Sequence, residues 1–87
     1  MVSQKVTIKN PSGLHARPAS LLAQAAGQCK SSTVIMYGDK TIQAKSILNI
    51  MAAAIKSGSE IEVQCTGETE EEDLKTLIDL IESGLGE

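Results

Sequence analysis

The chain has 87 residues, a net charge of −3 at pH 7, a hydrophobic content of 41% and a single aromatic residue, Tyr37. Length and apolar content predict one folded domain over residues 1–87 with an aliphatic core. The negative charge and the lack of aromatic side chains argue against a nucleic-acid-binding or membrane-binding surface. Since residues 1–10 lack the apolar stretch of a signal peptide, and no apolar run approaches the ~20 residues of a membrane span, we expect a cytoplasmic protein.

The first two expected elements are a short strand and a helix. Residues 6–9 alternate apolar and polar side chains, which is typical of a strand with one buried face. The Asn-Pro-Ser-Gly sequence at residues 10–13 interrupts this strand. A helix is then expected from about Ala16 to Ala26, with an alanine-rich apolar stripe and with Gly27 just beyond its end.

A hairpin and a second helix follow. Residues 33–37 and 40–44 are β-prone, and the Gly-Asp pair at residues 38–39 predicts a two-residue turn between them. Ser46 is a good N-cap for a short helix that includes residues 47–55.

The last strand and helix have the clearest patterns. Residues 60–66 alternate strictly, and Thr69 with Glu72 has the spacing of a capping box at the start of a helix that Gly84 ends. The acidic run at residues 70–73 suits a helix start, although a binding patch or metal site is an alternative. The buried stripe of this helix is expected to hold Leu74, Leu77, Ile78 and Ile81.

The order of the predicted elements is βαββαβα. Since each strand alternates, each buries one face, which argues for a four-stranded antiparallel sheet with all three helices on one face. The predicted fold class is therefore α+β, an open-faced β-sandwich. Cys29 and Cys65 have no metal-ligand spacing and only one histidine is available to help them, so we predict no metal site. In a reducing compartment we expect no disulfide, and no cofactor is predicted. Cys65 lies on the apolar side of its strand, whereas Cys29 can be either buried or exposed.

The only histidine, His15, lies where a loop becomes a helix, because Gly13 is a loop residue and Pro18 fits only a first helical turn. Free backbone N–H groups and the helix dipole suit an anion there, and phosphate is the usual one. Arg17 can bind such a phosphate with its guanidinium group. We therefore expect a histidine that accepts a phosphoryl group and passes it on; the alternative is a simple N-cap or loop histidine. Without a second acid–base residue, a stand-alone enzyme is not expected.

Residues 13–20 (Gly-Leu-His-Ala-Arg-Pro-Ala-Ser) resemble the active-site signature of the HPr family, the phosphocarriers of the bacterial phosphoenolpyruvate:sugar phosphotransferase system. Residues 45–51 are similar to the family's second signature, around a regulatory serine. The ending, residues 84–87, also matches, so the resemblance covers the whole chain.

The resemblance implies that Enzyme I phosphorylates His15 on Nδ1, and that His15 passes the group to IIA domains of sugar permeases. Arg17 and the backbone N–H groups of Ala16 and Arg17 would hold the phosphate. Ser46 would be phosphorylated by an HPr kinase/phosphorylase, slowing phosphoryl uptake and creating a corepressor for a catabolite-control transcription regulator. A monomer without cofactors is expected. From the sequence alone, Ser46 can equally be a plain N-cap.

The second helix allows two interpretations. Its periodicity puts Ile47, Ile50, Met51, Ala54 and Ile55 near one buried stripe. The resemblance implies instead that Ile47, Leu48 and Met51 are exposed and, with Ser20, form a docking surface. A helix that is apolar nearly all round satisfies both if Ile50, Ala54 and Ile55 are buried, and we favour this docking interpretation.

Two positions depart from the family pattern. Cys29 stands where many relatives have an aromatic residue, and Asn49 stands where many have a glycine. Because Asn49 lies in the expected docking helix, it bears on the affinity for a standard Enzyme I. Two rival functions remain: a purely regulatory relative acting through phosphorylated Ser46, and an acyl-carrier-like domain, which would need an Asp-Ser-Leu attachment site that the chain lacks.

Overall fold

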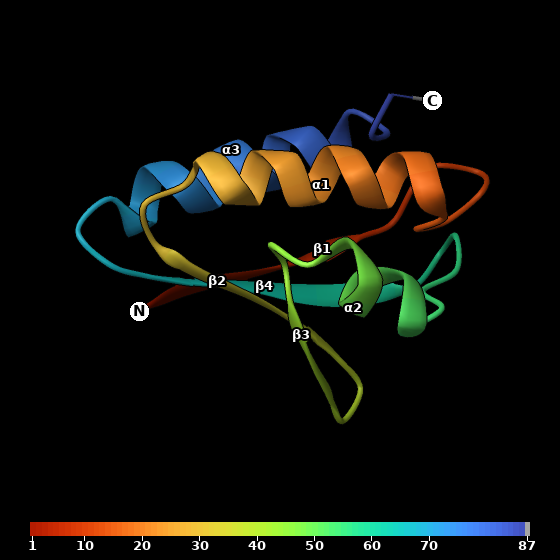
Figure 1. Cartoon of the computed structure of the whole chain (residues 1–87), viewed down its shortest axis with the longest axis horizontal. Coiled ribbons are helices and arrows are strands. Elements are labelled where there is room, and N and C mark those ends of the chain that lie inside the picture. Colours follow the sequence, from red (N-terminus) through yellow and green to blue (C-terminus); the bar gives the residue numbers. More distant parts are fainter. Residues whose placement is uncertain (87) are drawn as a thin grey trace.

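The computed structural model describes residues 1–86, so Glu87, the last residue of the expected family-like ending, lies outside the described residues. Its elements follow the predicted order βαββαβα (Figure 1). They are β1 (Val2–Thr7), α1 (Ala16–Gln28), β2 (Ser32–Tyr37), β3 (Lys40–Gln43), α2 (Ile47–Ala52), β4 (Glu60–Thr66) and α3 (Glu70–Glu82).

The four strands form one antiparallel sheet in the order β1-β4-β2-β3. Helices α1 and α3 lie side by side over one face of this sheet (Figure 1), and α2 packs against α1 and β3. This confirms the predicted open-faced sandwich. In strand β4, Ile61, Val63 and Cys65 are buried while Glu60 and Thr66 are exposed, as the alternation predicts.

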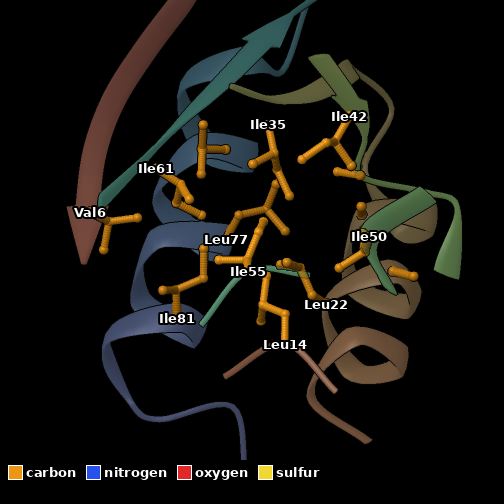
Figure 2. Close-up of a cluster of buried hydrophobic side chains, with 14 of the residues drawn as sticks. Val6, Leu14, Leu22, Ile35, Ile42, Ile50, Ile55, Ile61, Leu77 and Ile81 are labelled. Carbon is orange, nitrogen blue, oxygen red and sulfur yellow. The ribbon is translucent and has the colours of Figure 1, made fainter. Parts of the chain in front are cut away.

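The core between the helices and the sheet is aliphatic. Figure 2 shows side chains of β1, β2, β3 and β4 meeting Leu22 of α1, Leu77 of α3 and Ile50 of α2. Both cysteines join this core, which settles the open question for Cys29. Burial raises the pKa of the Cys65 thiol to about 11, and it also raises that of Cys29, so neither thiol is a ready nucleophile.

Several element boundaries differ from the sequence-based prediction, and three of the differences are informative. Strand β1 begins at Val2 because it pairs with β4 along its whole length, from Val2 opposite Cys65 to Thr7 opposite Glu60. Helix α1 continues through Gly27 to Gln28. Helix α2 ends at Ala52, three residues earlier than expected, and the exposed Ala54 has a positive φ of 54° that leaves the helical path. The expectation that Ala54 is buried was therefore wrong.

The start of α3 also differs. Thr69 is the N-cap, but its side chain makes no capping hydrogen bond, so the predicted capping box with Glu72 is wrong. The Thr69 hydroxyl instead donates to Asp73 Oδ2 (2.8 Å), while Glu70 Oε1 accepts from the Gly67 N–H (3.1 Å). The buried stripe of α3 is as predicted: Leu74, Leu77, Ile78 and Ile81. Among the described residues, no helix is long and apolar enough to cross a membrane.

Candidate functional site

His15 is the N-cap of α1, where the backbone is still extended (φ −77°, ψ −170°). Its carbonyl accepts the first intrahelical hydrogen bond, from the Ala19 N–H (2.8 Å). Its imidazole makes no capping hydrogen bond and is exposed. The backbone of His15 therefore caps the helix, while the ring remains accessible for chemistry.

The loop before His15 is held against the connection between α2 and β4. Gly13 has a φ of 67°, and its N–H donates to the Asn10 carbonyl (3.1 Å) while the buried Asn10 amide donates back to the Gly13 carbonyl. The Leu14 N–H donates to the Ile55 carbonyl (3.0 Å). Leu14 and Ile55 both point into the core (Figure 2), so the residue preceding His15 is fixed on both its backbone and its side chain.

The first turn of α1 presents an anion-binding surface. The N–H groups of Ala16 and Arg17 lie before the first intrahelical hydrogen bond, so the helix offers them no carbonyl acceptor. Pro18 has no N–H. The turn contains no acidic side chain. Arg17 is exposed and makes no ion pair with any of residues 1–86, so its guanidinium group is available to a ligand. These groups can hold phosphate oxygens next to the imidazole.

A pocket of about 540 Å³ adjoins the imidazole. It lies between the loop before α1 and the segment that follows α2. Its lining mixes apolar and polar residues: Pro11, Ser12, Leu14, His15, Met51, Ala54, Ile55, Lys56 and Ser57.

Helix α2 exposes three large apolar side chains, Ile47 (40% exposed), Leu48 (80%) and Met51 (43%), which we call the docking patch. Ile50 is fully buried and anchors the helix in the core (Figure 2). The structure thus exposes Ile47 and Met51, which periodicity alone would bury. Because Met51 also lines the pocket with His15, the patch is continuous with the histidine site.

The two remaining candidates are Ser46, next to the docking patch in the chain, and Ser20, on α1. Ser46 is the N-cap of α2, as predicted, and its Oγ accepts from the Asn49 N–H (3.2 Å). Ser46 is half-buried and Asn49 is exposed. Because Ser46 directly precedes Ile47, a modification of the Ser46 hydroxyl would lie at the start of the docking patch. Ser20, on α1, is half-buried.

Comparison with known proteins places this site in a family. Residues 2–83 match the family model described as PTS HPr component phosphorylation site. The chain belongs to the HPr family. The HPr-like protein Crh of Bacillus subtilis is 39% identical over 77 residues, which cover 88% of this chain and 91% of that protein. The phosphocarrier protein HPr of Neisseria meningitidis serogroup A is 37% identical over 87 residues, covering 100% and 98%.

Solved structures agree on the HPr fold. HPr-C-His from Thermoanaerobacter tengcongensis superposes with a TM-score of 0.95 at 41% identity, covering all of this chain and 98% of that one. Crh from Bacillus subtilis, described as a catabolite repression protein that forms a dimer by domain swapping, has a TM-score of 0.77 at 36% identity and 97% coverage of both chains. The family resemblance inferred from residues 13–20 is thereby confirmed, and the chain is a family member of the phosphocarrier type.

Two features of the HPr fold here were not predicted from the sequence. One is the role of Asn10, which the pattern marks only as an interruption after a strand. The other is Asp73, whose Oδ2 accepts from both the hydroxyl (2.6 Å) and the N–H (3.1 Å) of Ser31. Asp73 and Ser31 are 42 residues apart, so no local signal could have paired them. For Asn10, its place three residues before Gly13 was the available signal, since Asn and Gly commonly close turns.

Proposed function

We propose that this HPr-family protein accepts a phosphoryl group on Nδ1 of His15 from Enzyme I, which draws it from phosphoenolpyruvate, and transfers it to IIA domains of sugar permeases. The observation that carries the proposal is the exposed His15 ring at the start of α1, beside N–H groups that have no intrahelical acceptor. A carrier site must be reachable by two successive partners. An exposed ring on a fixed backbone meets that requirement.

The transfer needs little from the carrier beyond position and positive charge. The imidazole nitrogen attacks phosphorus, an N–P bond forms at His15, and the bond between phosphorus and the donor breaks on the opposite side. The Arg17 guanidinium and the N–H groups of Ala16 and Arg17 are placed to receive the equatorial oxygens. The reverse sequence passes the group to the next partner, so the chain is unchanged after one cycle.

The docking patch supplies the surface on which partners bind. Ile47, Leu48 and Met51, together with Ser20 of α1, would meet Enzyme I and the IIA domains in turn. An exposed apolar cluster next to a reactive group suits transient complexes, because its burial favours binding without a permanent interface. We expect the single domain to act as a monomer, in contrast to the domain-swapped Crh dimer.

A second role, regulation through Ser46, is favoured by the position of this hydroxyl and by the relative Crh, described as a catabolite repression protein. Phosphorylation by an HPr kinase/phosphorylase would add a charge of about −1.5 to −2 at the N-cap of α2, where the helix dipole tolerates it. That charge would repel an acidic Enzyme I surface from the docking patch. The modified face could then bind a catabolite-control transcription regulator.

The test is the intact mass after incubation with Enzyme I and phosphoenolpyruvate, beside the variant His15→Ala. The expected result is one acid-labile phosphoryl group on the natural chain and none on the variant. Incubation with HPr kinase and ATP should add a separate, acid-stable group that Ser46→Ala abolishes. If Enzyme I labels a known HPr in the same tube but not this chain, the carrier proposal fails. Label on Ser46 alone would favour the purely regulatory role.

A further inference from the structure

Lys56 lines the same pocket as His15, from the segment between α2 and β4. We propose that Lys56 is a second phosphate-contacting cation, which meets the phosphoryl group on His15 from the side of the pocket while Arg17 meets it from α1. This inference rests on the proposed phosphorylation of His15. It assigns a role to a residue outside both sequence signatures discussed above.

The backbone of Lys56 lies directly against the loop that carries His15. A Cβ built on Gly13 would be 2.7 Å from the Ile55 carbonyl oxygen and 3.0 Å from the Lys56 Cα, so only a glycine permits this approach. The hydrogen bond from the Leu14 N–H to the Ile55 carbonyl (3.0 Å) fixes the two segments in register. The backbone of Lys56 is therefore fixed against Gly13, which lies two residues before His15 in the chain.

The Lys56 side chain has no competing partner among residues 1–86. Lys75 binds Asp79 (2.9 Å), Lys9 approaches Glu82 (4.0 Å) and Lys40 donates to the Ala53 carbonyl (3.3 Å). Lys56 is exposed, and its side chain makes neither an ion pair nor a hydrogen bond with any of these residues. An anion entering the pocket would thus gain a cation without displacing an existing contact.

The chemistry of the phosphoryl group gives this cation a purpose. A phosphoryl group carries close to two negative charges near pH 7 and three acceptor oxygens. Arg17 and two backbone N–H groups approach from α1 only. A lysine is a compact, flexible charge that can follow the group as it arrives and leaves. Lys56 therefore complements the fixed donors of the helix by stabilising the phosphorylated form from the opposite segment.

The test uses phosphoramidate, which phosphorylates histidine without Enzyme I: its P–N bond breaks, ammonia leaves and the new N–P bond forms on His15. The pKa of the attached phosphoryl group is then followed by ³¹P NMR. In Lys56→Met this pKa should rise by roughly half a pH unit at low salt, because a nearby positive charge favours the dianion. The rise should shrink towards zero at 1 M salt, where the Debye length is about 3 Å.

Two variants serve as controls. Lys56→Arg should restore the pKa of the natural chain, since it keeps the charge. Lys30→Met removes the same charge beyond the C-terminal end of α1, at the other end of the helix from His15, and should leave the pKa unchanged.

Equal phosphoryl pKa values in the natural chain and in Lys56→Met would overturn the role of Lys56 without affecting the carrier proposal. Conversely, a chain that phosphoramidate labels on His15 but that Enzyme I does not would overturn the proposed function. The ³¹P measurement on that chain would still decide the role of Lys56.

Discussion

Access to His15 is determined by residues that carry no chemistry. Gly13 lets the loop pass within contact distance of Ile55 and Lys56, and Asn10 ties the turn on its other side. The imidazole itself makes no capping hydrogen bond to the helix. The imidazole is thus exposed, and the backbone that carries it is held by the neighbouring segments.

Replacement of Gly13 should show how much this approach contributes. In Gly13→Ala the new Cβ meets the Ile55 carbonyl at 2.7 Å in a backbone with φ +67°, so we expect the free energy of unfolding to fall by about 2 kcal/mol or more. Gly27→Ala is the matched control, because Gly27 lies inside α1 with no neighbour within 4 Å of the added carbon.

The control should gain about 0.5–1 kcal/mol, since alanine is the better helix former. Urea denaturation of both variants measures the two changes. A Gly13→Ala variant as stable as the natural chain would mean that the contact with Ile55 is not needed to hold the loop.

At the scale of elements, α2 has two tasks that its six residues must share. Ile50 anchors it in the core, while the docking patch leaves most of its apolar surface exposed. A helix this short gains little stability from its own hydrogen bonds. Packing of Ile50 therefore holds most of α2 in place, and the hydrogen bond from the Asn49 N–H to the N-cap Ser46 adds to it.

Two substitutions at Ser46 separate capping from charge. Ser46→Ala removes the acceptor for the Asn49 N–H and should lower the free energy of unfolding by about 1 kcal/mol. Ser46→Asp keeps an N-cap acceptor, so its stability should stay near that of the natural chain. Only the aspartate adds negative charge beside the docking patch, so it alone should markedly slow phosphoryl uptake from Enzyme I. Equal loss of stability in both variants would argue against the capping role.

Helix α3 contributes a polar clamp through Asp73 in its first turn. Hydrogen bonds to Asp73 lower the pKa of its carboxyl group below the ordinary value of 3.8. The largest effect comes from the Ser31 hydroxyl, and smaller ones come from the Thr69 hydroxyl and the Ser31 N–H. The clamp joins the segment just before β2 to the first turn of α3. The Gly67 N–H likewise lowers the pKa of Glu70. Two of the four carboxylates at residues 70–73 thus have structural partners.

The Asp73 clamp should make folding sensitive to acid. Because the folded-state pKa is lowered, its contribution is fully present well above pH 3.8 and is lost as the pH falls from about 4 through the folded-state pKa. Asp73→Asn should therefore be less stable at pH 7 and show a shallower loss of stability below pH 4. Thermal unfolding between pH 7 and pH 2 measures this. Glu71→Gln changes an exposed neighbour whose side chain makes no hydrogen bond or ion pair with residues 1–86, and it should match the natural chain at pH 7.

On the scale of the whole molecule, the net charge of −3 conceals a strong separation of charge. Residues 1–58 hold seven of the eight Lys and Arg residues but only one of the eleven acidic residues, Asp39. The acidic residues lie mainly on β4 and α3, whereas the His15 loop and α2 lie in the basic part. The negative net charge argues against binding to nucleic acids. It does not describe the charge around the His15 loop and α2, where partners would bind.

This separation predicts that salt slows delivery of the phosphoryl group. The rate of transfer from Enzyme I should fall as ionic strength rises from 0.01 to 1 M, since the Debye length shrinks from about 30 to 3 Å. Lys45→Gln, next to Ser46, should reduce the low-salt rate, while Glu71→Gln on α3 should not. Rapid-quench measurements of His15 labelling provide the rates. A rate independent of salt would mean that apolar contacts alone guide the partners.

The sequence alone was enough to predict the order of the elements, the buried stripe of α3 and the N-cap at Ser46, and it indicated His15 as the candidate phosphoryl acceptor. These features depend on local patterns: alternation, helical spacing, capping residues and the signature at residues 13–20. The start of β1 was misplaced because its pairing with β4 outweighs its weak local pattern. The end of α2 was misplaced because apolar residues continue past Ala52 although the helix does not.

The exposed side of α2 depends on the tertiary structure: periodicity alone would bury Ile47 and Met51, whereas the resemblance of residues 45–51 correctly indicated that both are exposed. Burial of Ile50 in the shared core made that choice and left Leu48 outside. In the same way, the contacts of Gly13 with Lys56 and of Ser31 with Asp73 join segments about 40 residues apart. Such contacts arise when packed helices and strands bring distant backbones together, and no local pattern encodes them.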